Sequence, residues 1–223
     1  PARVKVYTQS LDREAVARLT LEREMRGALE RNEFRAYFQP KINLHTGRIE
    51  ACEALARWVR PDRTIISPGR FIPVAEESGL IGALSDAIMR EACWKAAAWA
   101  RAGHPTKVAV NVSALQFRND RFADNVLRVV SHASLPPENL ELEITESVIM
   151  ADPERALRII QPLREAGVRL AIDDFGCGHS SLAALTKLPF DVIKIDQNSF
   201  ARLSGANRAR RRSSRSFSRS RAR

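Results

Sequence analysis

Charged and amide side chains recur inside or at the end of five short apolar stretches of the sequence. They are Glu53, Asn111, Glu143, the pair Asp173 and Asp174, and Lys194. Because residues i and i+2 of a strand share a face, Glu141 is expected to point the same way as Glu143. Carboxylate and amide oxygens are hard ligands, and no histidine or cysteine accompanies them, so Mg²⁺ or Mn²⁺ is favoured over zinc or copper.

Adjacent aspartates at one strand end can bridge two metal ions, an arrangement that suits hydrolysis of a phosphodiester. Asp173 and Asp174 form such a pair. Taken singly, each acidic residue can equally be a solvated cap at the end of a strand. Polar residues on five consecutive strands favour one shared site over five independent caps.

The elements that would carry these residues alternate between strand and helix. Strand-like stretches cover residues 36–43, 49–58, 107–113, 140–145, 169–175 and 191–196. Helical patterns cover 71–77, 81–102, 121–131 and 153–166, and a further one begins at residue 10 or 12. Strands separated by helices indicate βαβ units and therefore a mostly parallel sheet.

Two parallel architectures fit this alternation, an open doubly wound sheet and a closed (β/α)₈ barrel. A glycine-rich phosphate loop after the first strand would favour the open sheet, and the sequence has none. The polar residues instead follow the carboxyl ends of many different strands, where barrels build their active sites. We therefore predict an α/β fold of the (β/α)₈ barrel type.

The composition is that of a globular protein. The chain has 223 residues, of which 44% are hydrophobic and 28% charged, enough for one sizeable domain. No apolar run approaches the roughly 20 residues that cross a bilayer, so no membrane segment is expected. Three widely spaced cysteines, Cys52, Cys93 and Cys177, favour a reducing compartment over a disulfide framework.

The formal net charge of +10 is concentrated near the carboxyl end. Residues 197–223 contain nine of the 36 basic residues and none of the 26 acidic ones, so residues 1–196 carry a net charge of only +1. The basic excess therefore says nothing about the partners of the folded part, and no specific nucleic acid partner is expected.

Seven short motifs, in order, give a more specific indication. They are 37–40 (Tyr-Phe-Gln-Pro), Glu53-Ala54-Leu55 with Arg57-Trp58, 68–76, Asn111-Val112-Ser113, 143–146 (Glu-Ile-Thr-Glu), 173–176 (Asp-Asp-Phe-Gly) and Lys194-Ile195-Asp196. This series resembles the EAL family, bacterial phosphodiesterases of the second messenger cyclic di-GMP. The resemblance covers roughly residues 20–196. It implies a TIM-like barrel of the EAL type whose last two strands are missing from this chain.

The resemblance implies roles for the metal-site residues. Glu53, Asn111, Glu143 and Asp173 would hold one divalent metal, Mg²⁺ or Mn²⁺, and Asp173 with Asp174 would serve a second. Lys194 would lie beside the attacking water and stabilise charge on the phosphate, with a structural ion pair as the alternative. Glu53, Asp173 and Lys194 are thus the expected catalytic residues.

The resemblance also implies substrate and partner contacts. Gln39, Leu55 and Arg57 would contact cyclic di-GMP, since a guanidinium suits a phosphate oxygen. Glu146 would anchor the loop at residues 175–182, which in the family couples the site to homodimer formation. The location implied is the bacterial cytoplasm, with a tether possible through an absent upstream region.

Three segments are expected along the chain. Residues 1–19 resemble the end of a diguanylate cyclase (GGDEF) domain with a connecting helix, although an ordinary N-terminal arm is the alternative. Residues 20–199 would be an incomplete EAL domain, and 200–223 a disordered Arg/Ser-rich tail. A shifted reading frame is the preferred interpretation of the tail, against a basic arm for nucleic acid or anionic membrane, or another truncation.

Three functions remain open at this point. The first is hydrolysis of cyclic di-GMP to linear pGpG, impaired because a late-strand glutamate and glutamine of the family are absent. The second is a non-catalytic module that binds cyclic di-GMP or a protein. The third is nucleic-acid binding through the tail. Unpaired strand edges would also make the short chain poorly stable.

Deleting residues 201–223 tests the third function. Because residues 201–223 contain one aromatic residue and nine arginines, we expect only weak, sequence-independent DNA or RNA binding that falls steeply with salt. Filter binding of the full and shortened chains between low and physiological salt measures this. A sequence-selective complex that survives physiological salt would contradict the interpretation of the tail.

Overall fold

The computed structural model describes residues 9–175 and 189–195. Its helices are α1 Gln9–Glu30, α2 Pro68–Glu77, α3 Ile81–Arg101, α4 Ala114–Phe117, α5 Phe122–Ala133, α6 Glu146–Ala151 and α7 Pro153–Glu165, with a 3-10 turn at Pro137–Asn139. Its strands are β1 Phe34–Ile42, β2 Ile49–Val59, β3 Ile65–Ile66, β4 Lys107–Val112, β5 Leu140–Thr145, β6 Arg169–Phe175 and β7 Val192–Ile195. All six strand-like stretches of the sequence are therefore strands.

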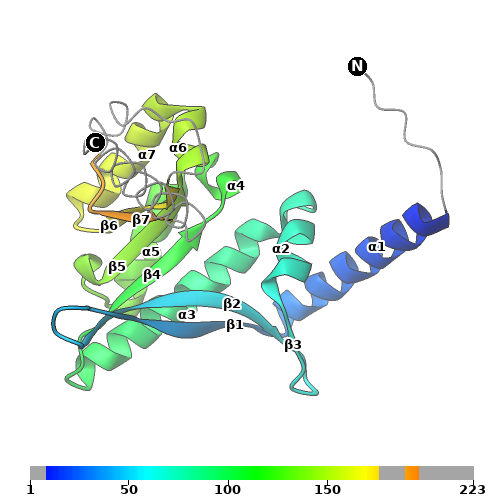
Figure 1. The fold of residues 1–223 in the computed structure, drawn as a ribbon, viewed down its shortest axis with the longest axis horizontal. Helices are drawn as coiled ribbons and strands as arrows, with labels where there is room; N and C mark the ends of the chain where they lie inside the picture. The colour runs from blue at the N-terminus through cyan, green and yellow to red at the C-terminus, as the bar shows by residue number, and fades with distance from the viewer. Residues whose placement is uncertain (1–8, 176–188, 196–223) are drawn as a thin grey trace, which may run out of the picture.

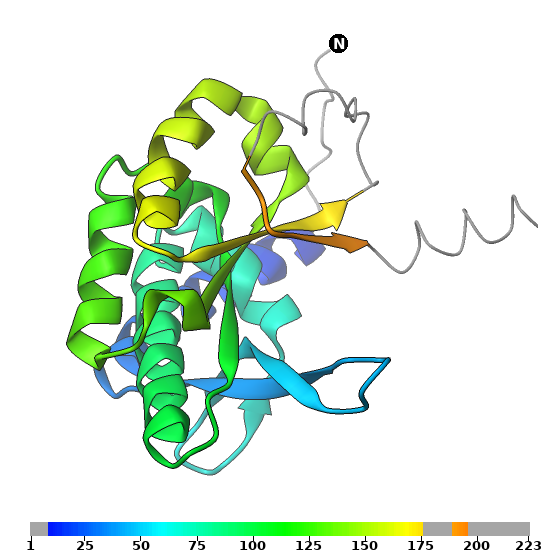
Figure 2. The ribbon, with the colours of Figure 1, turned by 90° about the vertical axis from the view of Figure 1, so that its left-hand side faces the viewer.

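The described strands form one curved sheet in the order β1-β2-β4-β5-β6-β7, with β3 paired to β2. The pairs from β2 to β7 along this path are parallel, and the helices α3, α5 and α7 lie side by side against one face (Figures 1 and 2). Within the described residues β1 and β7 are the two edges, so this part of the chain is an α/β partial barrel.

The first strand departs from the βαβ pattern, because β1 runs antiparallel to β2. The connection between them is a short turn in which the Asn43 side chain accepts hydrogen bonds from the amides of His45 and Thr46. Gly47 completes the turn with a φ of +68°, a conformation that glycine adopts without strain. A turn this short cannot cross over the sheet, so the two strands must be antiparallel.

The helices α3, α5 and α7 bury their apolar faces against the sheet. Leu84, Ile88, Val126 and Ile160 are almost fully buried, together with the apolar strand residues that face them. Alternation along β2 separates this core from the opposite face, because Ala54 is buried in it while its neighbour Glu53 points the other way. The helix layer thus leaves the concave face of the sheet to polar residues.

One region of the continuous core, which we call the second core cluster, joins α1 and α2 to the β1–β2 hairpin. The rings of Phe34, Trp58 and Phe71 lie with centroids 5.3–6.3 Å apart, and Met25 of α1 is fully buried. The indole Nε1 of Trp58 donates a 2.9 Å hydrogen bond to the buried Glu33 carboxylate. This cluster holds the lower half of α1 to the domain.

The upper half of α1, which is its N-terminal half, projects away from the domain (Figure 1). Val16 and Leu19 on it are 63% and 66% exposed. The helix continues without a break through residue 19, so the expected boundary between a linker and the EAL segment lies inside one helix. The Arg18 guanidinium forms an ion pair with Glu77, which ties this half to α2.

Short elements were missing from the sequence prediction. They are β3, α4 and α6, each of two to six residues. The α4 turn begins with a capping box, in which the Ser113 hydroxyl accepts from the Gln116 amide and the Gln116 side chain accepts from the Ser113 amide. None of the described helices could span a membrane. The expected loop at 176–182, with Cys177, and the tail at 200–223 lie outside the described residues.

Replacing Phe71 with alanine tests the second core cluster. Phe71 is fully buried, so the cavity should lower the free energy of unfolding by about 3–5 kcal/mol. Ile65→Ala is the matched control, because Ile65 is 49% exposed and should cost about 0.5 kcal/mol or less. Urea denaturation followed by tryptophan fluorescence measures both. Equal losses in the two variants would contradict this account of the core.

Candidate functional site

Parallel register brings the predicted polar residues together on the concave face. Asn111 of β4 lies directly opposite Glu143 of β5, and the Asn111 amide donates a 3.0 Å hydrogen bond to Glu53 of β2. Asp173 follows on β6, opposite Thr145. Residues that are 30–60 positions apart in sequence therefore line one row of neighbouring strands.

Lys194 of β7 lies among the carboxylates of this row. Its ammonium Nζ is 2.6 Å from Glu143 Oε2 and 3.3 Å from both Glu53 Oε2 and Asp173 Oδ2. Burial lowers the pKa of Lys194, but the carboxylates, Glu143 above all, outweigh it and raise the pKa above its ordinary value. Lys194 is therefore protonated throughout the neutral range.

Glu143 is the most enclosed member of the site. Its side chain has no exposed surface and lies between two lysines, with Lys194 on Oε2 and Lys41 Nζ 2.6 Å from Oε1. Burial raises the pKa of Glu143, and the two ammonium groups counter that rise. Glu53 differs, because the Asn111 and Lys194 contacts outweigh its burial and lower its pKa.

Lys41 is a site residue that the sequence prediction missed. It also contacts Glu141 Oε1 at 3.0 Å, which confirms that Glu141 and Glu143 point the same way. Lys41 stands two residues after Gln39 on one strand, and this spacing was the signal that could have placed it on the same face. β1 runs antiparallel to β2, and its C-terminal end places the Lys41 side chain against the β5 residues Glu141 and Glu143.

Asp174 and Glu146 have different surroundings from the residues that contact Lys194. Asp174 is exposed and adopts a φ of +55°, an uncommon conformation for a residue with a Cβ, and its amide donates to Asp173 Oδ1 at 2.9 Å. Glu146 is buried and is the first residue of α6. The loop that it was expected to anchor lies outside the described residues.

The expected substrate-binding residues lie on β1 and β2, near Glu53. Gln39 of β1 is exposed and pairs in register with Glu53. Leu55 and Arg57, two and four residues after Glu53, line a cavity of about 490 Å³ together with Pro68, Ile72 and Asn111. Arg57 is half-buried and donates to the carbonyl of Ala56 at 2.8 Å. A cavity beside the carboxylates with a guanidinium at its wall can accept a phosphate.

The donor set suits a hard divalent cation. Three carboxylates surround one positive charge, the Lys194 ammonium, and the Asn111 amide contacts one of these carboxylates, that of Glu53. Across residues 9–175 and 189–195, no three carboxylate, imidazole or thiolate side chains are arranged to hold a metal ion directly. In type and charge the residues fit Mg²⁺ or Mn²⁺. The Lys194 side chain would have to move away from the three carboxylates before such a cation could lie among them.

The family model of the EAL domain matches residues 22–221. The match extends beyond residue 196, where the recognised motifs end, and includes most of the Arg/Ser-rich stretch. The domain boundary expected at residue 199 therefore stays a prediction.

Relatives with similar sequence come from several bacteria. The chain is 44% identical over 197 residues to the uncharacterized protein y4lL of Sinorhizobium fredii, covering 88% of this chain and 24% of that protein. It is 40% identical over 192 residues to MucR of Pseudomonas aeruginosa, a bifunctional diguanylate cyclase/cyclic di-GMP phosphodiesterase, covering 86% of this chain and 28% of MucR. The chain thus spans about a quarter of the length of these relatives.

Solved structures share the fold. The MucR phosphodiesterase in complex with cyclic di-GMP superposes with a TM-score of 0.78 at 40% identity, covering 83% of this chain and 75% of that one. The EAL domain of FimX from Pseudomonas aeruginosa, bound to cyclic di-GMP, has a TM-score of 0.71 at 28% identity, covering 81% and 72%. The TIM-barrel-like fold predicted from the sequence is therefore confirmed, and the chain belongs to the EAL domain family.

Proposed function

We propose that this chain carries the phosphodiesterase site for cyclic di-GMP and hydrolyses it to linear pGpG. The observation that carries the proposal is the row of Glu53, Glu143 and Asp173 around one positive charge, beside the cavity lined by Leu55 and Arg57. The similarity to the MucR phosphodiesterase supports it.

Glu53, Asn111, Glu143 and Asp173 would hold one Mg²⁺ or Mn²⁺, and Asp173 with Asp174 a second. A divalent cation there would neutralise charge on the phosphodiester and make water a better nucleophile. Glu143, which has no exposed surface, would keep its orientation because Lys41 holds its other oxygen. Lys41 would thus fix the orientation of one ligand in this row.

The chain's other residues would bind and orient the substrate. Arg57 would pair with a phosphate oxygen, and Gln39 and Leu55 would contact the rest of the dinucleotide. Water would attack phosphorus in line with the bond to the leaving ribose oxygen, and that oxygen would take up a proton as the ring opens. Lys194, protonated at neutral pH, would stabilise the negative charge that develops on the phosphoryl oxygens.

A second candidate is a module that binds cyclic di-GMP without hydrolysing it. The observation that favours it is the Lys194 ammonium itself, which occupies the centre of the carboxylate row in a structure where no three described carboxylates are arranged to hold a metal. In this case Arg57 and the adjoining cavity would still bind the dinucleotide. Hydrolysis in Mn²⁺, compared with binding in Ca²⁺, separates the two candidates.

The relatives bear on which domain adjoins this one. Because MucR combines a diguanylate cyclase with a phosphodiesterase, we propose that α1 connects this domain to an upstream GGDEF domain in the bacterial cytoplasm. Homodimer formation through residues 175–182 is part of the same proposal. It predicts that α1, whose upper half is exposed, contacts the preceding domain.

Glu53→Ala tests the metal site. Loss of one carboxylate should reduce Mn²⁺-dependent production of pGpG by about 100-fold or more, because a hard cation loses a ligand and several kcal/mol of charge stabilisation. Chromatography of the nucleotide products measures it. Glu50→Ala is the control, since Glu50 lies on the same strand, is exposed and contacts Asn43. Wild-type turnover by Glu53→Ala would refute the assignment.

Lys194→Met separates a catalytic role from a structural ion pair. Glu53 and Asp173 would lose their ion-pair partner and Glu143 would keep only Lys41. The free energy of unfolding should therefore fall by about 1–3 kcal/mol, less than for a fully buried pair because a quarter of Lys194 is exposed. Turnover at a temperature where the variant is folded should nevertheless be lost. Lys107→Met is the control, a neighbouring lysine that forms no ion pair within the described residues. A folded, active Lys194→Met variant would show that the role is structural.

A further inference from the structure

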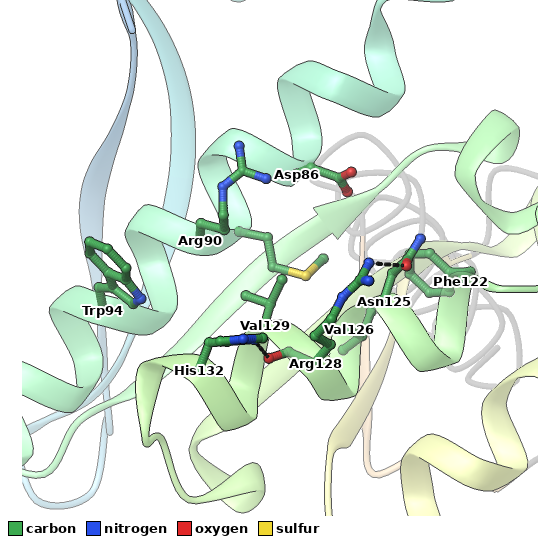
Figure 3. A pocket seen from close by; sticks show the side chains of 10 residues that line it. Asp86, Arg90, Trp94, Phe122, Asn125, Val126, Arg128, Val129 and His132 are labelled. Atoms are coloured by element: carbon green, nitrogen blue, oxygen red, sulfur yellow. Dashed lines mark hydrogen bonds between the residues drawn. The ribbon is translucent and has the colours of Figure 1, made fainter.

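A groove runs over the outside of the helix layer, between α3 and α5 (Figure 3). It has a volume of about 390 Å³ and adjoins a second cavity of about 810 Å³ that reaches the start of β1. The two share Arg90, Trp94 and His132, so we treat them as one surface, the α3–α5 groove. It lies on the opposite side of the sheet from the carboxylates of the site.

The floor of the α3–α5 groove is apolar and preformed. Met89 and Val126 are 2% and 1% exposed and belong to the core, so the floor cannot collapse into the protein. On the rim, Trp94 is 62% exposed and stands four residues after Arg90 on the same face of α3. A large exposed ring next to a buried apolar floor is a typical anchor point for a partner's side chain.

The rim is positively charged. Five cationic side chains line the groove against the carboxylates of Asp86 and Glu91; they are Arg35, Arg90, Lys95, Arg101 and Arg128. Glu91 is already paired with Arg35 at 2.8 Å. Since residues 1–196 carry a net charge of only +1, this excess is a local feature and not a property of the whole surface.

The cations are held open toward solvent. Arg128 Nη2 donates to the neutral Asn125 Oδ1 at 2.6 Å, and His132 Nδ1 lies 2.7 Å from the Arg128 carbonyl, as the dashed lines in Figure 3 mark. Arg90 and Lys95 form no ion pair with any residue in the described ranges. Burial raises the pKa of Asp86, and the nearby charges of Arg90 and Arg128 partly offset that rise.

We propose that the α3–α5 groove binds an acidic segment of a partner protein, whose apolar side chain packs on Trp94 and whose carboxylates pair with Arg90 and Arg128. The apolar floor suits a side chain better than it suits a sugar-phosphate backbone. The charge and the shape thus select a peptide.

The test uses the full chain and a pool of fluorescein-labelled peptides in which glutamate and aspartate flank a single leucine or phenylalanine. Fluorescence polarisation should detect binding that weakens as salt rises. Arg90→Glu, Arg128→Glu and Trp94→Ala should each weaken binding by about tenfold, which corresponds to about 1.4 kcal/mol. Circular dichroism melts establish that each variant is folded.

Arg158→Glu on α7 is the matched control, because it makes the same charge change on an exposed helix face away from the groove. It should leave peptide binding within about twofold of wild type, or about 0.4 kcal/mol. Equal losses in Arg158→Glu and Arg90→Glu would overturn the proposal. So would the absence of peptide binding, or tighter binding of an oligothymidylate through the same residues.

Discussion

Negatively charged side chains from β2, β5 and β6 meet on the concave face of the sheet, and their mutual repulsion must be offset before the strands can lie side by side. Two like charges about 4 Å apart repel by about 4 kcal/mol near a protein surface, a large part of the 5–15 kcal/mol that stabilises a domain. The Lys194 ammonium lies within 3.3 Å of all three carboxylates. It therefore links the strand at one edge of the described sheet to the strands at its centre.

Lys41 performs the same task from the other edge. Because β1 runs antiparallel to β2, the residues after Gln39 run toward the N-terminal end of β2, and Lys41 lies opposite Ala51. This brings the Lys41 ammonium to the second oxygen of Glu143 and to Glu141. The two lysines together join β1 and β7 to β5 by charge, although the two edge strands do not pair with each other in the described part of the chain.

The helix layer separates two surfaces of opposite character. The concave face carries acidic residues that are paired with lysines. The α3–α5 groove on the outside instead has more cationic than acidic side chains around an apolar floor. Helix α3 serves both, because Leu84 and Ile88 pack on the sheet while Arg90 and Trp94 face solvent. An occupant of the groove would thus contact a helix that also supports β2, which carries Glu53 and Arg57.

The sequence alone predicted the six longer strands and the main helices, and it named the residues of the candidate site. Short apolar strands and amphipathic helices are local patterns, and so they were readable without any contact information. The same holds for the family motifs around Glu53, Glu143 and Asp173. Tertiary structure decided what depends on distant neighbours. The place of Lys41 against Glu143, the position of Lys194 among three carboxylates and the shared lining of one groove by Trp94 and Arg128 each join residues tens of positions apart. No local spacing encodes such contacts, because they arise only when the strands are in register and the helices are packed.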